Sequence, residues 1–172
     1  MRKNKLFYLS FLIPTLFLLY LMAKPFMAFA FGEEIQMKTI PVDPRDPFYG
    51  DYVRLKFEDA TIPAEKIDPS FLKELERYEY NSYGSDAGFY VAFEKDKAVQ
   101  VTKSRPSGTY LKVKGYYNPS RKTLSVTYPF DRYYLKEGTG LYWEDRSREG
   151  KIVGTVKVWM GYGYLKSIRT EQ

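Results

Sequence analysis

Three carboxylates surround one guanidinium in a short segment near the start of the polar part of the chain: Asp43, Asp46 and Asp51 lie close to Arg45 in sequence. Such a group can bind a cation or hold a partner through charged hydrogen bonds. A rigid turn explains the same residues, because aspartate side chains accept hydrogen bonds from nearby backbone amides, and Gly50 adopts conformations that other residues avoid. We favour the turn and keep the binding site as the alternative.

A second charged group follows late in the chain, with Arg132 and Glu137 and, further on, Glu144. These side chains could pair with the first group across the fold. Exposed ion pairs are common and contribute little to stability. We therefore interpret this group as solvated or structural ion pairs, and keep Arg132 and Glu137 as candidate binding residues.

The chain contains no cysteine and no histidine. This composition excludes disulfides, thiol nucleophiles, zinc sites built on those side chains, and serine–histidine triads. Catalysis would have to depend on carboxylates, lysine, tyrosine or serine. Ser70 and Lys73 have the Ser-x-x-Lys spacing of penicillin-recognising enzymes, but the chain lacks the Ser-Asp-Asn and Lys-Thr-Gly motifs that accompany it. We therefore predict no catalytic residue, no metal site and no cofactor.

Aromatic residues are abundant, with 17 Tyr, 12 Phe and 2 Trp. Some of them are adjacent, as in Tyr133-Tyr134 and Tyr142-Trp143. They could form a platform for a glycan or a protein partner. Tyrosine is also a common residue of half-buried strands, and we favour that simpler interpretation.

The N-terminus has the pattern of a membrane segment. Arg2, Lys3 and Lys5 precede an uncharged apolar run over residues 6–23, and apolar residues resume after Lys24-Pro25 as far as residue 31. Eighteen helical residues extend for about 27 Å, close to the ~30 Å hydrocarbon core of a bilayer. The basic tip predicts that the N-terminus stays in the cytoplasm and that the remainder lies outside it.

A cleaved signal peptide is the alternative, with Ala28-Phe29-Ala30 as the cleavage site. The apolar core of such a peptide has about 7–15 residues. Because the run in this chain is longer, we favour an uncleaved single-pass anchor that contacts the membrane through residues 6–31.

The net charge of +6 is concentrated in the membrane segment. Four of the 27 basic residues fall within the first 32 residues, which hold no acidic residue, so the remainder has 23 basic against 21 acidic residues. A nearly balanced domain outside the cytoplasm gives little support to nucleic-acid binding. We expect no nucleic-acid partner.

Alternating polar and apolar residues predict short strands over most of the remaining chain. The strands are expected at 34–40, 52–58, 89–95, 98–104, 109–117, 123–128, 151–160 and 162–169. Asp68-Pro69 begins a predicted helix over 69–79, and 128–143 should hold turns and a helical piece.

These elements predict a mainly β (α+β) chain: an N-terminal transmembrane helix, then one antiparallel barrel-like or sandwich domain with one or two short helices. Residues 1–31 would form the cytoplasmic tip and anchor, and 32–172 the extracytoplasmic domain. The only candidate for a tether between them is the stretch over 24–34.

One segment carries a specific resemblance. Gly50, Asp51, Tyr52 and Leu55 stand at the spacing of the signature of the GDYXXLXY family, with Phe57 in place of its last tyrosine. This substitution keeps the ring and loses the hydroxyl. The segments over 41–47 and 128–138 also resemble blocks of that family. The resemblance implies a membrane-anchored, extracytoplasmic bacterial protein of the cell envelope whose activity is unknown.

The sequence therefore favours a non-catalytic module that binds a membrane or envelope partner. One alternative is a cell-envelope enzyme that uses the Asp/Arg cluster. Another is a signal-peptidase-like fold without catalysis, because a proline-rich run before a Gly-Asp strand is similar to that family, while no serine occupies the nucleophile position between residues 42 and 47.

Overall fold

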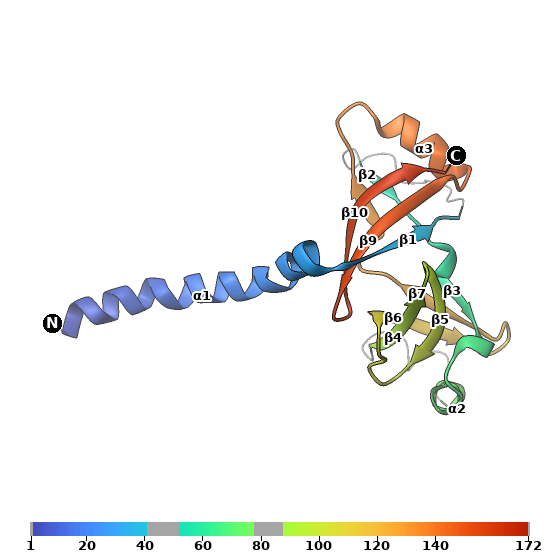
Figure 1. Cartoon of the computed structure of the whole chain (residues 1–172), viewed down its shortest axis with the longest axis horizontal. Coiled ribbons are helices and arrows are strands. Elements are labelled where there is room, and N and C mark those ends of the chain that lie inside the picture. The colour runs from blue at the N-terminus through green and yellow to red at the C-terminus, as the bar shows by residue number, and fades with distance from the viewer. Residues whose placement is uncertain (1, 41–51, 78–87, 172) are drawn as a thin grey trace.

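The computed structural model describes residues 2–40, 52–77 and 88–171. A long N-terminal helix, α1, extends as an arm from a β-rich domain (Figure 1). All strand pairs within the sheets are antiparallel. The predicted fold class, an apolar helix followed by a mainly β barrel-like domain, is confirmed.

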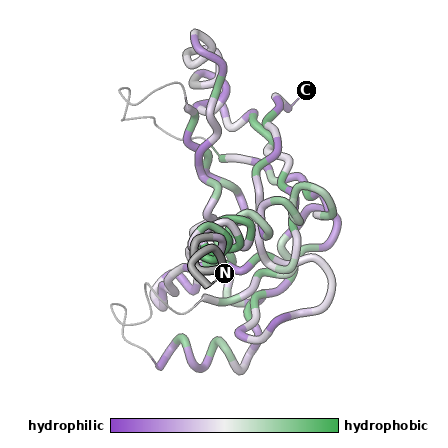
Figure 2. Tube along the Cα trace, turned by 90° about the vertical axis from the view of Figure 1, so that its left-hand side faces the viewer, coloured by the Kyte–Doolittle hydropathy of each residue, from purple (hydrophilic) through white to green (hydrophobic). Residues whose placement is uncertain are grey.

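Helix α1 (Arg2–Phe31) includes a stretch, Tyr8–Phe31, that is long and apolar enough to span a membrane. The side chains of this stretch are exposed almost throughout, and it has no polar face (Figure 2). A helix that is apolar on all sides and exposed to solvent is unsuited to a soluble protein. A signal sequence meets the same length and composition criterion as an anchor.

The predicted tether over 24–34 is wrong. α1 continues past Pro25 to Phe31, and strand β1 begins two residues later at Glu33. Ala28 is fully buried, and the Gly32 N–H donates to the Ala28 carbonyl at 2.9 Å. The arm is therefore joined to the domain through packed helix and strand.

Helix α1 leads directly into a three-stranded sheet. Its order is β1 (Glu33–Lys38), β9 (Ile152–Trp159) and β10 (Tyr162–Thr170). The β9–β10 hairpin turns at Met160 and Gly161, both with positive φ (47° and 84°). Such two-residue turns fit the right-handed twist of the flanking strands.

A five-stranded sheet forms the second part of the domain, in the order β3-β7-β6-β4-β5. Ile67 forms a parallel bridge to Val101 of β5. Because Ile67 follows soon after the opposite edge strand β3, this bridge brings the two edges together and nearly closes a barrel. The strand bounds are β3 Thr61–Pro63, β4 Phe89–Glu94, β5 Lys97–Thr102, β6 Thr109–Asn118 and β7 Thr123–Thr127.

Strands β2 (Tyr52–Arg54) and β8 (Arg132–Tyr134) pair with each other. Isolated bridges join the sheets: Thr39 to Phe57, and Leu111 to Gly161. The predicted strand over 52–58 is thus shorter, and β3 and β8 were not predicted. After Arg54 the backbone bonds first to Asp131 and then to Ile40, so no single partner continues the ladder.

The described part of the domain contains two α-helices. α2 (Pro69–Arg77) begins where predicted: the Asp68 carboxylate accepts from the N–H of Ser70 at 2.9 Å and of Phe71 at 3.3 Å. Its predicted end at 79 falls outside the described residues. The helical piece predicted within 128–143 lies later in the chain, because α3 (Gly140–Arg148) overlaps that range only at its first turn. Single 3₁₀ turns, η1 (Glu58–Ala60) and η2 (Ala64–Lys66), flank β3.

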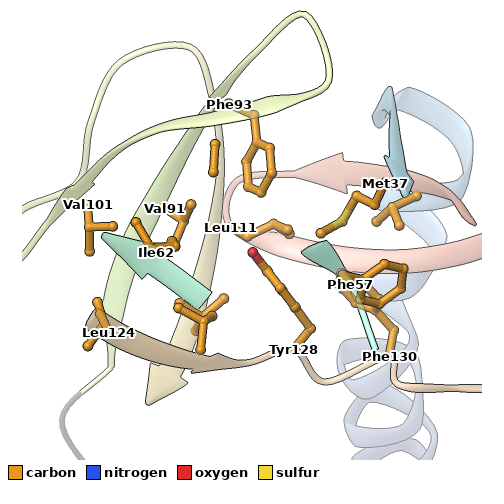
Figure 3. Close-up of a cluster of buried hydrophobic side chains, with 14 of the residues drawn as sticks. Met37, Phe57, Ile62, Val91, Phe93, Val101, Leu111, Leu124, Tyr128 and Phe130 are labelled. Atoms are coloured by element: carbon orange, nitrogen blue, oxygen red, sulfur yellow. The ribbon is translucent and has the colours of Figure 1, made fainter. Parts of the chain in front are cut away.

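One hydrophobic core fills the space between the sheets. Figure 3 shows Tyr128 between an aromatic group around Phe57 and Phe130 and an aliphatic group around Ile62 and Leu124. The Phe57 ring meets those of Tyr128 and Phe130 edge-on, each with centroids 5.7 Å apart. Aromatic pairs prefer this geometry, and it connects the signature segment to the segment after β7.

Candidate functional site

The β2–β8 pair brings together the two blocks that the sequence singled out. Tyr52 lies opposite Tyr134, Val53 opposite Tyr133, and Arg54 opposite Arg132. Strand side chains alternate between faces. Val53 and Tyr133 pack on the core, so the other two pairs share the outer face. We call Tyr52, Arg54, Arg132 and Tyr134 the tyrosine–arginine patch.

Side-chain contacts order this patch. The Tyr52 and Tyr134 rings lie 6.2 Å apart between centroids. The Arg132 guanidinium lies 5.5 Å from the Tyr52 ring centroid, in cation–π contact. Arg54 Nε lies 3.7 Å from Asp131 Oδ2 in an exposed ion pair. The Tyr134 side chain is 78% exposed. The patch therefore presents rings and guanidinium groups to solvent.

The electrostatics of the patch are unbalanced. Arg54 and Arg132 face each other across the strands, and like charges in this position destabilise a sheet. Asp131 offsets the charge of Arg54. Arg132 forms no ion pair with a carboxylate of the described residues. A guanidinium held on a ring, with its charge uncompensated, can receive a carboxylate or phosphate through two parallel hydrogen bonds.

Helix α3 lies against β2 and continues the same chemistry. The Arg146 guanidinium is 5.5 Å from the Tyr142 ring centroid, and Tyr142 and Trp143 meet edge-on at 5.4 Å. Figure 1 places α3 and β2 together at one end of the domain, to the side of the axis of α1. Tyrosine and arginine are enriched where protein partners bind.

The predicted site residues separate into three groups. The structure describes none of Asp43, Arg45, Asp46, Gly50 and Asp51, which lie outside the described residues. Leu55 and Phe57 are buried core residues, so the ring that replaces the signature's last tyrosine packs in the interior. Tyr52 and Arg132 meet in the patch.

The possible pairing of Arg132 with the Asp/Arg cluster stays a prediction, because that cluster lies outside the described residues; Arg132 does contact the Tyr52 ring. Glu137 is exposed and forms no ion pair with another described residue. The side chain of Glu144 lies outside the described part of the chain. Tyr134 was considered only within the aromatic pair Tyr133-Tyr134, and Arg54 and Asp131 were not among the predicted site residues. Alternation along the strand could have found Arg54 and Tyr134, which lie two residues from Tyr52 and Arg132 respectively.

A carboxylate with a raised pKa lies elsewhere, in η1. Burial raises the pKa of Asp59, while the Ala98 N–H and nearby Lys66 act against the rise. The Tyr128 hydroxyl donates to the Asp59 backbone carbonyl at 3.1 Å, and burial raises the pKa of Tyr128 as well. Among the described residues no cluster of three or more carboxylates could hold a metal ion. This site is suited to structural hydrogen bonding.

Comparison of the chain with known proteins identifies one family. The family described as "GDYXXLXY protein" matches residues 14–168, which includes α1 from Pro14, both strands of the patch and the β9–β10 hairpin. The comparisons with curated proteins and with solved structures found no match. The match covers nearly the whole chain, and the chain belongs to the GDYXXLXY protein family.

Proposed function

We propose that this chain is a membrane-anchored, extracytoplasmic module of the bacterial cell envelope that binds a protein partner through the tyrosine–arginine patch and performs no catalysis. Residues 1–31 form the cytoplasmic tip and anchor, and residues 32–172 form the binding domain. The observation that carries the proposal is the pair of facing arginines, Arg54 and Arg132, of which one has its charge uncompensated among the described residues.

The energetics of the patch favour a binding role. Placing two like charges opposite each other costs a few tenths of a kcal/mol or more. An acidic partner would reverse this cost by inserting a carboxylate between the guanidinium groups. The exposed Tyr134 ring adds apolar area and loses little side-chain entropy on binding. Asp43, Arg45, Asp46 and Asp51 precede β2 directly in sequence, and we propose them as further contact residues.

The orientation of the anchor is supported by Arg2, Lys3 and Lys5, because basic residues stay on the cytoplasmic side. Protease added outside intact spheroplasts should then remove the β-rich domain and leave a membrane-bound stub. Protection of the domain in intact spheroplasts, with digestion after lysis, would overturn the proposed orientation. Release of the chain in soluble form after cleavage near Ala30 would overturn the anchor.

Partner binding is tested by placing a photo-cross-linking amino acid at Tyr134 in the full-length protein in its native cells. We expect one specific adduct, reduced on the order of tenfold or more by Arg132→Glu, as for the loss of an interface hot spot. The same cross-linker at Tyr116, an exposed tyrosine on β6, is the matched control. No adduct at Tyr134, or the same adduct at both positions, would contradict the proposal and return weight to an envelope enzyme.

A further inference from the structure

A cleft of about 630 Å³ lies where α1 meets the tip of the β9–β10 hairpin. Its volume falls within the range of ligand-binding pockets, about 300–1,000 Å³. The walls are mainly apolar. They come from Ala23, Lys24 and Met27 of α1, from residues 159–163 of the hairpin, and from Arg105, Lys112 and Pro129. We call this the juxtamembrane cleft.

The position of the cleft along α1 is fixed by sequence. The uncharged run ends at residue 23, and Lys24 is the first charge after it. A charged side chain at this point marks the boundary between hydrocarbon and headgroups. Ala23 and Lys24 line the cleft, so it opens at that boundary once α1 is in a bilayer.

The hairpin tip has the composition of a membrane interface. Trp159 and Tyr162 flank the turn and line the cleft, and Met160 at the turn is 57% exposed. Tryptophan and tyrosine are enriched at the level of the lipid headgroups. An exposed apolar turn beside a membrane helix can enter the interface where it would otherwise face water.

α1 is held firmly against the sheet, so the cleft has a defined shape. Lys157 Nζ donates to the Phe29 carbonyl at 2.7 Å and lies 5.6 Å from the Phe29 ring centroid. A Cβ added at Gly32 would lie 3.2 Å from the Lys157 Cβ, so the end of α1 approaches β9 closely. On the other side, the Lys112 N–H donates to the Gly161 carbonyl at 2.8 Å.

The charges of the cleft are all positive. Lys24, Arg105 and Lys112 line it together with no acidic residue. Within the described ranges none of the three forms an ion pair with a carboxylate. The Arg105 guanidinium lies 5.3 Å from the ring centroid of Tyr110, a buried residue next to Gly161. An apolar cleft with unpaired cations at a membrane boundary matches an amphiphile with an anionic head.

We propose that the juxtamembrane cleft binds one anionic phospholipid of the outer side of the membrane that α1 enters. The upper part of an acyl chain lies against Ala23 and Trp159, and the phosphate contacts Lys24, Arg105 and Lys112 on the headgroup side. This inference rests on the membrane anchoring proposed above. It assigns a lipid site to a surface separate from the tyrosine–arginine patch, so lipid binding and partner binding can occur together.

The experiment uses the fluorescence of Trp159 in the full-length protein, reconstituted into phosphatidylcholine vesicles. Trp143→Phe leaves Trp159 as the single tryptophan, because the chain has only two. Brominated lipid quenches tryptophan on contact. We expect more quenching by brominated phosphatidylglycerol than by the same mole fraction of brominated phosphatidylcholine, and we expect added salt to reduce the difference.

Arg105→Gln with Lys112→Gln should lower the preference for phosphatidylglycerol on the order of tenfold, since each basic residue near an anionic membrane surface contributes severalfold. Lys73→Gln with Lys136→Gln removes the same charge from residues outside the cleft and should leave the preference unchanged. Melting curves verify that each variant folds. If a variant unfolds, the proposal is still tested by the salt dependence of the lipid preference in the Trp143→Phe protein, whose cleft is unaltered.

The experiment distinguishes failure of the proposed lipid site from failure of the proposed membrane anchoring. Protein that floats with the vesicles but is quenched equally by both lipids overturns the lipid site and leaves the anchor intact. Equal loss of preference in both double variants also overturns it, because the cleft would then contribute nothing specific. Protein that does not float with vesicles overturns the proposed anchoring and the lipid site with it.

Discussion

The segment from Tyr52 to Phe57 has one face in the hydrophobic core and one face toward solvent. Val53, Leu55 and Phe57 point inward and are buried, whereas Tyr52 and Arg54 point outward, where Tyr52 is half-buried and Arg54 exposed. A single run of alternating residues thus supplies part of the core and half of the tyrosine–arginine patch. The inward side chains should determine stability, and the outward side chains should determine binding at little cost in stability.

The largest effect should come from Phe57→Ala. The Phe57 ring is 2% exposed and contacts two other rings, so its removal leaves a cavity and should lower the free energy of unfolding by about 3–5 kcal/mol. Denaturant unfolding followed by circular dichroism measures the change. Lys56→Ala, one residue away on the exposed face, is the matched control and should change stability by less than about 0.5 kcal/mol. Similar losses of unfolding free energy in both variants would show that the buried and exposed faces contribute equally to stability.

Tyr128→Phe sharpens the comparison inside the core. This variant keeps the ring beside Phe57 and removes only the hydroxyl that donates to the Asp59 carbonyl. The free energy of unfolding should fall by about 1 kcal/mol, because a partly buried acceptor loses its donor. The same denaturant measurement tests it. An unchanged stability would mean that packing alone holds this ring.

Asp131→Asn tests the outward face. It removes the carboxylate beside Arg54 and leaves Arg54 and Arg132 facing each other. Stability should fall by about 0.5 kcal/mol at low salt, and the loss should shrink as salt screens the repulsion. Melting temperatures of variant and parent over a salt series measure this. A loss that does not depend on salt would point to the backbone bond between the Leu55 N–H and the Asp131 carbonyl instead.

Alternation and turn residues predicted the long strands β4 to β7, β9 and β10, because each keeps a regular partner over most of its length. The same reasoning overextended β2. Its side chains alternate to Phe57, but its backbone changes partner after Arg54, and such a change depends on distant residues. The contact of Tyr52 with Arg132 required the register of two strands about 80 residues apart, which a single sequence does not contain.

An effect as small as that of Asp131→Asn concerns Asp59 and depends on pH. Burial raises the pKa of Asp59 above its ordinary value near 3.8. In the window between 3.8 and the raised value, the folded chain binds more protons at this residue than the unfolded chain, so stability falls as pH rises through it. At neutral pH the ionised carboxylate therefore destabilises the fold, and Asp59→Asn should increase stability by about 0.5 kcal/mol.

The difference between parent and Asp59→Asn isolates this residue from carboxylates that titrate in the opposite sense. Hydrogen bonds from Lys166 to Glu34, and from Ser70 to Asp68, lower the pKa of each acceptor, so both residues lose their contribution as pH falls. These contributions are common to parent and variant and cancel in the difference. The advantage of Asp59→Asn should vanish below pH 3.8. If the variant were still more stable than the parent at that pH, the gain would come from better packing of the amide beside Ala98. It would not come from removal of the Asp59 charge.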